Sequence, residues 1–398
     1  MTSSRQGGAG RARTPWLSEL AGGLGDCGLF LPIAIAMITL NGLNATAVFV
    51  GVGAIYVATA LYFRVPVPVQ PLKAFAAAAI ALNLGPEVLA AGALLMALII
   101  GVLGASGLAG WLSARFPLVL VRGIQAAVAL LLLKAAVSLA ERGNWEGLPA
   151  IDPLLSGAIA LGAFIVLVLA RNRSLPASLI VLGAGALVGV LAGSLPDGVG
   201  LGAQPVSLSV PDGAAFATAL TALVIAQIPL TFGNAVVATC DAERQYFGER
   251  ASRVVPNRIS ASIAAGNVIG GLSGGMPVCH GAGGATAHYS MGARSGRATV
   301  AAGVIFIGAG LLLGASLPAV LMVLAPGALA GMLAFVAFEH GLLAARLERL
   351  DDRLIAATVG VVTLLAGNLA VGFGVGVALV LLRRALGGAP VATSESPA

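Results

Sequence analysis

Apolar stretches long enough to cross a lipid bilayer follow one another from Ser18 to Arg384, and most charged residues lie between them. A transmembrane helix needs about 20 mostly apolar residues, and fewer where it is broken and enclosed by protein. Of this chain 58% is apolar and 10% charged, whereas a soluble domain is about 25% charged. So few charges cannot cover a water-facing surface. The sequence therefore predicts an all-α integral membrane protein.

About fourteen segments satisfy this length rule. The third and tenth are short, polar and opened by proline, and the eighth is interrupted by Pro229 and Gly233. The chain's 55 glycines suit helices that pack closely through small faces. The predicted segments begin near Ser18, Asn44, Pro68, Gly85, Phe116, Asp152, Ala177, Gly213, Pro256, Pro277, Thr299, Gly327, Leu354 and Asn368.

The placement of the cations predicts the topology, because cytoplasmic loops collect Lys and Arg. With fourteen segments and a cytoplasmic N-terminus, all but three of the 22 Lys and Arg residues fall on the inner side. Of those three, Arg142 falls outside, and Lys73 and Lys134 fall within segments. We therefore expect a protein of the cytoplasmic (inner) membrane with both termini in the cytoplasm. The strong bias also argues against a nucleic-acid binder, despite the net charge of +6.

The two short segments indicate an inverted repeat. VPVPVQPLKAFAAAAI at 65–80 aligns with GGMPVCHGAGGATAHY at 274–289, which places Pro68 on Pro277. Seven segments separate the two, and because seven is odd, the halves have opposite orientations, as in many secondary transporters. The predicted parts are a tail (1–15), a first repeat (16–193), an extracytoplasmic loop (194–212), a second repeat (213–385) and a tail (386–398).

The motif PVPVQPLK predicts an extended stretch followed by a helix start inside the protein, since its three prolines prevent a regular helix before Leu72. Lys73 would lie at that start, with Gln70 beside it as a neutral donor. A cation within a membrane is costly and usually functional, so we expect Lys73 to bind an anion. The alternatives are a Lys73 that reaches the interface or forms a structural ion pair with Asp26, an acid that could also carry a proton.

The mirrored segment offers a second helix start, where Gly281, Gly283 and Gly284 allow the backbone to approach a ligand closely. A helix N-terminus carries about half a positive charge and unpaired N–H donors. Two such starts and Lys73 together favour an oxyanion, divalent or monovalent. His280 is either a packing residue, an anion donor or a proton carrier.

Polar residues in the eighth segment, Gln227, Thr231 and Asn234, share one face of a regular helix and could line the site or pack between helices. The adjacent pair Cys279 and His280 cannot readily close a tetrahedral metal site. We therefore expect no metal, no cofactor and no enzyme activity.

Three motifs resemble the molybdate transporter family, which is related to the sulfate permease (SulP) superfamily: GGLGDCGLFLP from Gly22, VPVQPLK from Val67 and GGMPVCHGAGG from Gly274. One departure concerns Leu29, which stands where the family has a hydroxyl in its GDLGTF motif. This puts a first-segment contact with the anion in doubt. Unlike sulfate permeases, the chain is expected to lack a STAS domain.

The resemblance implies a seven-plus-seven repeat with a core domain (segments one to four and eight to eleven) and a gate domain (the remainder). It implies a secondary active transporter that imports molybdate by elevator-like motion, with tungstate as a further substrate. Carried onto this chain, the implied binding residues are Gln70, Lys73, Cys279, His280, Gly281, Gly283 and Gly284, and Asp26 matches the first-segment acid; the residue analysis adds Thr231 and Asn234.

Several alternatives stay open. Sulfate or general oxyanion transport is the nearest, a proton-coupled nucleobase permease is more distant, and an anion channel would differ in flux saturation. The expected partners are the tetrahedral oxyanion, the lipid bilayer, a co-transported proton or sodium ion and a second copy of the chain in a homodimer, with no nucleic acid.

Overall fold

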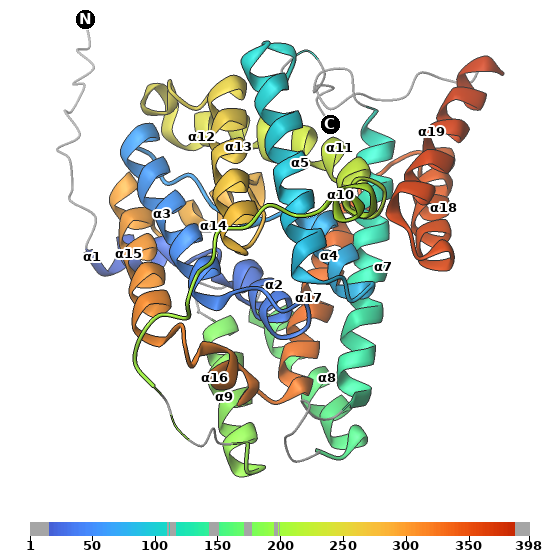
Figure 1. The fold of residues 1–398 in the computed structure, drawn as a ribbon. Coiled ribbons are helices and arrows are strands. Elements are labelled where there is room, and N and C mark those ends of the chain that lie inside the picture. Colours follow the sequence, from blue (N-terminus) through green and yellow to red (C-terminus); the bar gives the residue numbers. More distant parts are fainter. Residues whose placement is uncertain are drawn as a thin grey trace, which may run out of the picture.

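The computed structural model is a bundle of helices with one two-stranded sheet, so the predicted all-α class holds apart from two very short strands (Figure 1). It describes residues 16–109, 111, 117–142, 151–170, 177–194, 198 and 200–386. The predicted N-terminal tail (1–15) and residues 387–398 of the predicted C-terminal tail lie outside the described residues.

The first half of the chain contributes eight helices and one strand to the described structure. Their order is α1 (Trp16–Gly23), α2 (Cys27–Thr39), α3 (Ala45–Phe63), β1 (Gln70–Pro71), α4 (Lys73–Ala81), α5 (Pro86–Ala105), α7 (Leu118–Arg142), α8 (Pro153–Ala170) and α9 (Ala177–Leu191).

The second half contains two π-helical turns, η1 and η2, and one 3-10 turn, η3, among its α-helices. Their order is α10 (Gly213–Ala219), η1 (Leu220–Val224), α11 (Ile225–Leu230), η2 (Thr231–Val237), α12 (Ala238–Phe247), η3 (Gly248–Ala251), α13 (Pro256–Ser273), β2 (Val278–Cys279), α14 (Ala282–Ser290), α15 (Gly296–Leu313), α16 (Leu317–Met322), α17 (Pro326–Ala344), α18 (Leu350–Ala366) and α19 (Leu369–Ala385).

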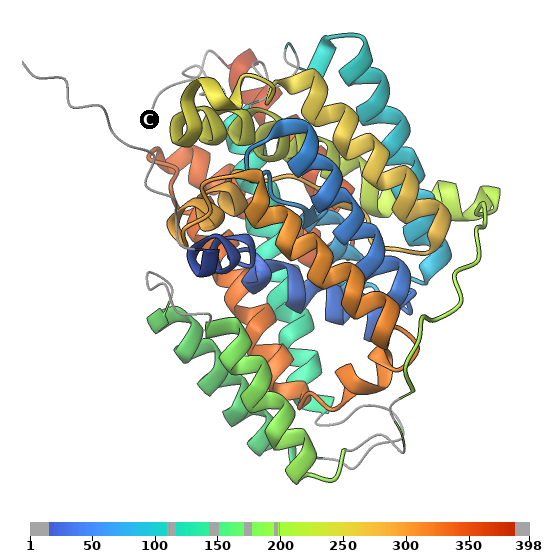
Figure 2. The ribbon, with the colours of Figure 1, turned by 90° about the vertical axis from the view of Figure 1, so that its left-hand side faces the viewer.

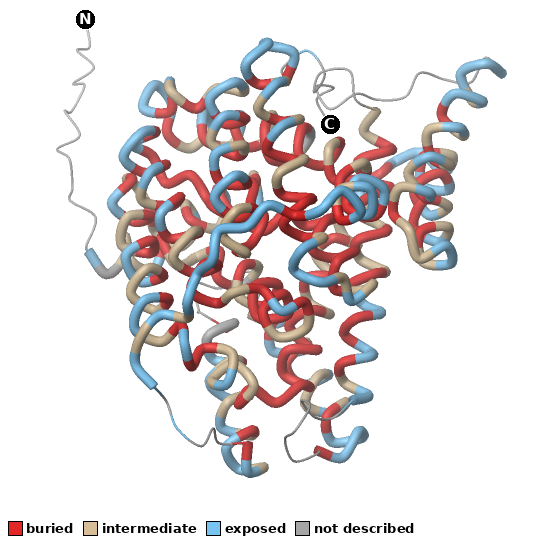
Figure 3. The backbone as a smooth tube through the Cα atoms, in the orientation of Figure 1, coloured by how far each residue is buried: buried red, intermediate tan, exposed pale blue. Residues whose placement is uncertain are grey.

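Seven helical stretches are long and apolar enough to cross a membrane, by length and composition. Large apolar side chains such as Leu154 (84% exposed) and Leu365 (81% exposed) lie on the surface, where lipid would cover them. Figure 3 shows the buried segments gathered in the interior of the bundle. The seven stretches are Ala45–Phe63, Pro86–Ala105, Leu118–Arg142, Pro153–Ala170, Gly213–Leu230, Gly296–Leu313 and Pro326–Ala344.

The short segments fold as the prolines predict. An extended stretch leads through β1 into α4, which begins at Lys73, and a matching stretch leads through β2 into α14, which begins at Ala282. Both helices have nine residues. The alignment of Pro68 with Pro277 is an offset of 209 residues. Adding this offset to Lys73 and Ala81 gives Ala282 and Ser290, the first and last residues of α14.

The long helices pack in pairs that mix the two halves: α3 lies against α15 and α5 against α13, while α7 lies against both α17 and α18. Glycines permit the close approach of α3 and α15. A Cβ on Gly53 would lie 2.5 Å from the Gly303 carbonyl oxygen, and a Cβ on Gly303 would lie 2.6 Å from that of Gly53. The two backbones therefore touch where neither residue has a side chain.

The first segment has a break that its sequence does not predict, and the eighth is irregular at Pro229 and Gly233, the two residues expected to interrupt it. A turn at Leu24–Asp26 separates α1 from α2, and Asp26 precedes α2 directly. In the eighth segment, Pro229 lies in α11 between the two π-helical turns. A proline lacks an N–H and crowds the preceding turn, and a wider turn accommodates this defect.

A mostly exposed connection over residues 200–212 runs along one edge of the molecule to α10 (Figure 2). It follows one set of helix ends. The Gln204 side chain accepts a hydrogen bond from the Ala45 amide at the start of α3, and the Ser209 amide donates to the Leu272 carbonyl near the end of α13. The connection makes up most of the segment 194–212, which the sequence predicts to be an extracytoplasmic loop.

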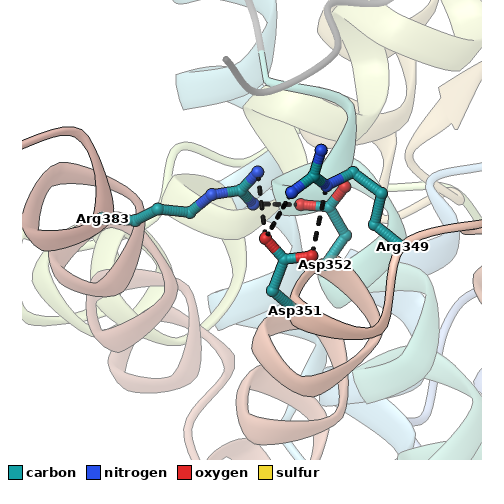
Figure 4. A network of polar contacts seen from close by, with 4 residues as sticks. All are labelled: Arg349, Asp351, Asp352 and Arg383. Carbon is teal, nitrogen blue, oxygen red and sulfur yellow. Dashed lines mark hydrogen bonds and ion pairs between the residues drawn. The ribbon is translucent and has the colours of Figure 1, made fainter. Parts of the chain in front are cut away.

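An ion-pair network joins the start of α18 to the end of α19, away from the turn that connects the two helices (Figure 4). Arg383 near the end of α19 pairs with Asp351 and Asp352 in the first turn of α18, and Asp351 also pairs with Arg349 at 3.2 Å. Asp352 and Arg383 are only 8% and 11% exposed in their side chains. The network holds the two C-terminal helices together.

Candidate functional site

The extended lead-ins of α4 and α14 form one antiparallel ladder, in which Gln70 lies opposite Cys279 and Pro71 opposite Val278. Beyond the ladder, the Leu72 amide donates to the Pro277 carbonyl at 3.2 Å. Asn267 of α13 braces β2, because its side chain donates to the Val278 carbonyl (2.6 Å) and accepts from the Val278 amide (3.2 Å). The starts of α4 and α14 are thereby held side by side.

Gln70 joins the predicted acid to the predicted cation. Its Nε2 donates to both carboxylate oxygens of Asp26, at 2.8 and 2.7 Å, and its Oε1 accepts from Nζ of Lys73 at 2.7 Å. All three side chains are buried. Asp26 and Lys73 are therefore connected through a neutral amide, and the structure shows no direct ion pair between these two described residues. Two of the three Lys73 donors make no hydrogen bond to the described residues.

The first turn of α4 has free backbone donors. The Phe75 amide donates to Oε1 of Gln227 at 3.0 Å, and Nε2 of Gln227 donates to the Thr231 hydroxyl at 3.0 Å. Within the described residues, the amides of Lys73 and Ala74 donate to no protein acceptor. Unpaired N–H groups at a helix start are anion donors.

The first turn of α14 repeats this feature, because no described group accepts from the amides of Ala282, Gly283 or Gly284. A Cβ on Gly281 would collide with the Gln70 side-chain oxygen, and a Cβ on Gly284 would lie 2.5 Å from Gln70 Nε2 and 2.9 Å from an Asp26 oxygen. These two glycines make room for the Asp26–Gln70–Lys73 chain. A Cβ on Gly283, by contrast, would meet no atom within 4 Å. The open side of the helix start is therefore at Gly283.

His280 and Cys279 contact the extended stretch that leads into α4. The His280 Nδ1 lies 2.6 Å from the Pro68 carbonyl oxygen, and Nε2 lies 3.0 Å from the Ser262 hydroxyl. A carbonyl only accepts, so Nδ1 carries the proton and Nε2 accepts from Ser262. Cys279 is buried, and its sulfur lies 3.4 Å from the Pro71 carbonyl. The protein thus already occupies both ring nitrogens of His280.

The polar face predicted for the eighth segment is only partly formed. Gln227 and Thr231 contact each other and reach the start of α4. The π-helical turn from Thr231 to Val237 then changes the rotation per residue, so the spacing of a regular helix does not carry the face on to Asn234. The Asn234 carbonyl accepts from the Thr239 hydroxyl, and the side chain is partly exposed.

Two further buried polar residues lie outside the sequence motifs. His340 of α17 is 4% exposed, and its Nδ1 has no partner among the described groups. The sequence motifs do not include Asn267. The feature that could have identified it is its position as an amide side chain within an apolar and glycine-rich stretch of α13.

Together these groups form a buried cradle with positive potential. Two helix starts contribute about half a charge each, and Lys73 adds a full charge. The Asp26 carboxylate, which accepts from the Gln70 amide, offsets part of this positive charge. Backbone donors, an ammonium group and an open glycine side together suit the oxygens of a small anion.

The proteins similar to this chain in sequence include molybdate transporters. The family described as molybdate transporter of the MFS superfamily matches residues 18–132 and 219–339, which include every motif of the cradle. Molybdate transporter 2 of Arabidopsis thaliana is 29% identical and aligns with 94% of this chain and 88% of its own. Molybdate transporter 1 of Chlamydomonas reinhardtii is 28% identical over 77% of this chain and 80% of its own.

Relatives in structure share the fold at low identity. The transmembrane domain of the cyanobacterium bicarbonate transporter BicA superposes with a TM-score of 0.67 at 18% identity, covering 89% of this chain and 97% of that domain. The murine anion transporter Slc26a9 superposes with a TM-score of 0.66 at 16% identity, covering 95% of this chain and 70% of its own. The chain has the fold of these membrane transporters, and by its sequence it belongs to the molybdate transporter family.

Proposed function

We propose that this protein is a secondary active transporter that carries molybdate into the cytoplasm and binds it between the starts of α4 and α14. The observation that carries the proposal is the convergence of Lys73 with two helix starts whose first amides have no protein acceptor. The molybdate transport of its relatives supports the choice of substrate. Tungstate, another tetrahedral dianion, is proposed as a second substrate.

The residues divide into ligands and supports. Lys73 and the amides of Gly283 and Gly284 would donate to the oxyanion. Gln70 would fix the direction of Lys73, and Asp26 would fix Gln70 or take up a coupled proton. The contacts of His280 and Cys279 assign them to the support of the lead-in strands. Gly281 provides space, and Thr231 acts through Gln227.

The proposed architecture is fourteen membrane segments in two inverted repeats, residues 16–193 and 213–385, with both termini in the cytoplasm. Two observations support it. The nine-residue helices α4 and α14 have matching bounds at the offset of 209, and the pairs α3–α15 and α5–α13 exchange under that offset. The core of α1–α5 and α10–α15 would then move against a gate of α7–α9 and α17–α19 to give alternating access.

The test is a thermal-shift titration of the purified protein in detergent with molybdate, tungstate, sulfate and uracil. Molybdate and tungstate should raise the unfolding temperature at micromolar concentrations, while sulfate should require a large excess. An equal response to sulfate would make the protein a general oxyanion carrier. A response to uracil alone would contradict the anion site and favour a nucleobase permease.

A further inference from the structure

Two cations remain outside both the cradle and the predicted cytoplasmic side, and they line the same cavity. Lys134 and Arg142 lie two helical turns apart on α7, and Ser138 lies midway between them, so all three share one helix face. The cavity has a volume of about 100 Å³. It is lined by Leu40, Ile80, Ala81, Asn83, Lys134, Ala135, Ser138, Leu139 and Arg142.

The cavity lies at the far end of the helix that begins at Lys73. Its lining includes Ile80, Ala81 and Asn83 at the end of α4. Eight residues at about 1.5 Å each place the end of α4 ~12 Å from its start. In the proposed topology this end faces the extracytoplasmic side, and α7 belongs to the gate while α4 belongs to the core. The cavity thus lies between the two moving parts, outward of the cradle.

Neither cation has a fold-stabilising partner among the described residues. Neither Lys134 nor Arg142 makes an ion pair or a side-chain hydrogen bond within the described residues. Cations can serve a helix C-terminus, but three of the last four carbonyls of α4, those of Ala78, Ala79 and Ile80, already have partners. The Asn41 side chain and the Leu84 amide donate to the Ala79 carbonyl, and the Asn83 amide donates to that of Ile80.

We infer that this cavity is a second anion site, which captures the oxyanion from the extracytoplasmic solution before it reaches the cradle; the inference rests on the proposed function. The volume corresponds to roughly three water molecules at ~30 Å³ each, enough for one tetrahedral oxyanion. Lys134 and Arg142 supply the charge, and the Ser138 hydroxyl and Asn83 amide supply neutral donors. Outward cations are rare in a membrane protein, so their convergence on one cavity indicates a function.

Cysteine labelling tests the charge of the cavity directly. Ser138→Cys introduces an exposed thiol, while Cys27, Cys240 and Cys279 are buried and give little background. In proteoliposomes, a negatively charged methanethiosulfonate should modify this thiol about tenfold faster than a positively charged one of similar size, as field-focused association predicts. Adding Lys134→Gln and Arg142→Gln should remove the preference, and millimolar molybdate or sulfate should slow the reaction. Equal rates for both reagents, or no protection by either anion, would overturn the inference.

Transport measurements separate this site from the cradle. Lys134→Gln/Arg142→Gln should raise the KM for molybdate uptake about five- to tenfold at low ionic strength, leave the maximal rate unchanged and abolish the salt dependence of KM. Lys134→Arg/Arg142→Lys should behave like the parent, and Arg384→Gln removes an exposed cation elsewhere as a control. An unchanged KM in a folded double glutamine variant would refute capture. If the parent protein neither binds nor transports molybdate, the proposed function fails, whereas the labelling result still decides whether the cavity binds anions.

A lipid phosphate is also an anion with oxygen acceptors. It could reach the cavity, because Lys134 and Ser138 also border an apolar groove between α7 and Leu364 of α18. The labelling is therefore compared in liposomes of phosphatidylcholine alone and with phosphatidylglycerol. Protection by molybdate in both supports a soluble anion. Protection that requires phosphatidylglycerol and ignores molybdate would assign the cavity to a lipid headgroup and overturn the inference.

Discussion

The two half-helices α4 and α14 have the same length and the same kind of lead-in, but their first turns carry different chemistry. The α4 side supplies the charged and amide side chains Lys73 and Gln70. The α14 side supplies glycines, so that its backbone approaches those side chains and leaves one open face. The proposed site would thus combine two half-helices, one giving charge and the other giving space and backbone donors.

Lys73→Ala should produce the largest change, because it removes the only full positive charge that the structure places in the cradle. Losing a buried, hydrogen-bonded charge costs about 2–5 kcal/mol of binding. We expect molybdate affinity, measured by isothermal titration, to fall about 30-fold or more. A folded Lys73→Ala protein with parental affinity would show that α14 alone holds the anion. Arg384→Gln serves as the matched loss of a cation at an exposed position.

Gln70→Ala and Cys279→Ala compare the two residues that lie opposite each other in the ladder. Gln70→Ala leaves the buried Asp26 and Lys73 without their shared partner, and we expect an affinity loss of tenfold or more with a clear drop in unfolding temperature. Cys279→Ala removes only a weak contact to Pro71 and should change affinity less than twofold. Equal effects in thermal-shift titrations would remove the functional difference between the halves.

Gly283→Ala and Gly284→Ala probe the space on the α14 side. Gly284→Ala places a methyl group against Gln70 and should destabilise the protein by about 1–3 kcal/mol. Gly283→Ala meets no protein atom and should keep the unfolding temperature while weakening molybdate binding several-fold, if the anion occupies that open side. Full affinity in Gly283→Ala would place the anion elsewhere.

His280→Asn should have the smallest effect on transport. The ring is held between the Pro68 carbonyl and the Ser262 hydroxyl, so its loss should cost about 1 kcal/mol of stability. The pH profile of molybdate uptake should remain that of the parent. A shifted profile in His280→Asn, with Ser262→Ala unshifted, would instead show that His280 exchanges protons during transport.

The sequence predicts much of this arrangement because membrane segments and proline-opened helix starts leave strong local signals. The three prolines predict an extended stretch before Leu72, and α4 begins at Lys73. The aligned motifs predict a matching helix in the second half, and α14 has the bounds of α4 shifted by 209 residues. The indirect link between Asp26 and Lys73 could not be predicted, since it depends on the orientation of one amide, that of Gln70.

The eighth segment shows why the remainder escapes prediction. A helical face is inferred from a constant rotation per residue, and the π-helical turn at Thr231–Val237 breaks that assumption. Asn267 and His340 likewise have no local motif. Asn267 reaches the cradle only because α13 packs against β2.

The ladder between β1 and β2 has a consequence for how the ion leaves. Backbone hydrogen bonds join the two lead-ins, so drawing the two helix starts apart to loosen their grip on a bound ion would break the ladder. In the proposed transport cycle, the ion and its ligands from α4 and α14 would therefore move as one unit. Release would then depend on hydration: water reaching the cradle from the cytoplasm would compete for the ion's oxygens and for Lys73, and the off-rate would follow the width of the inner opening.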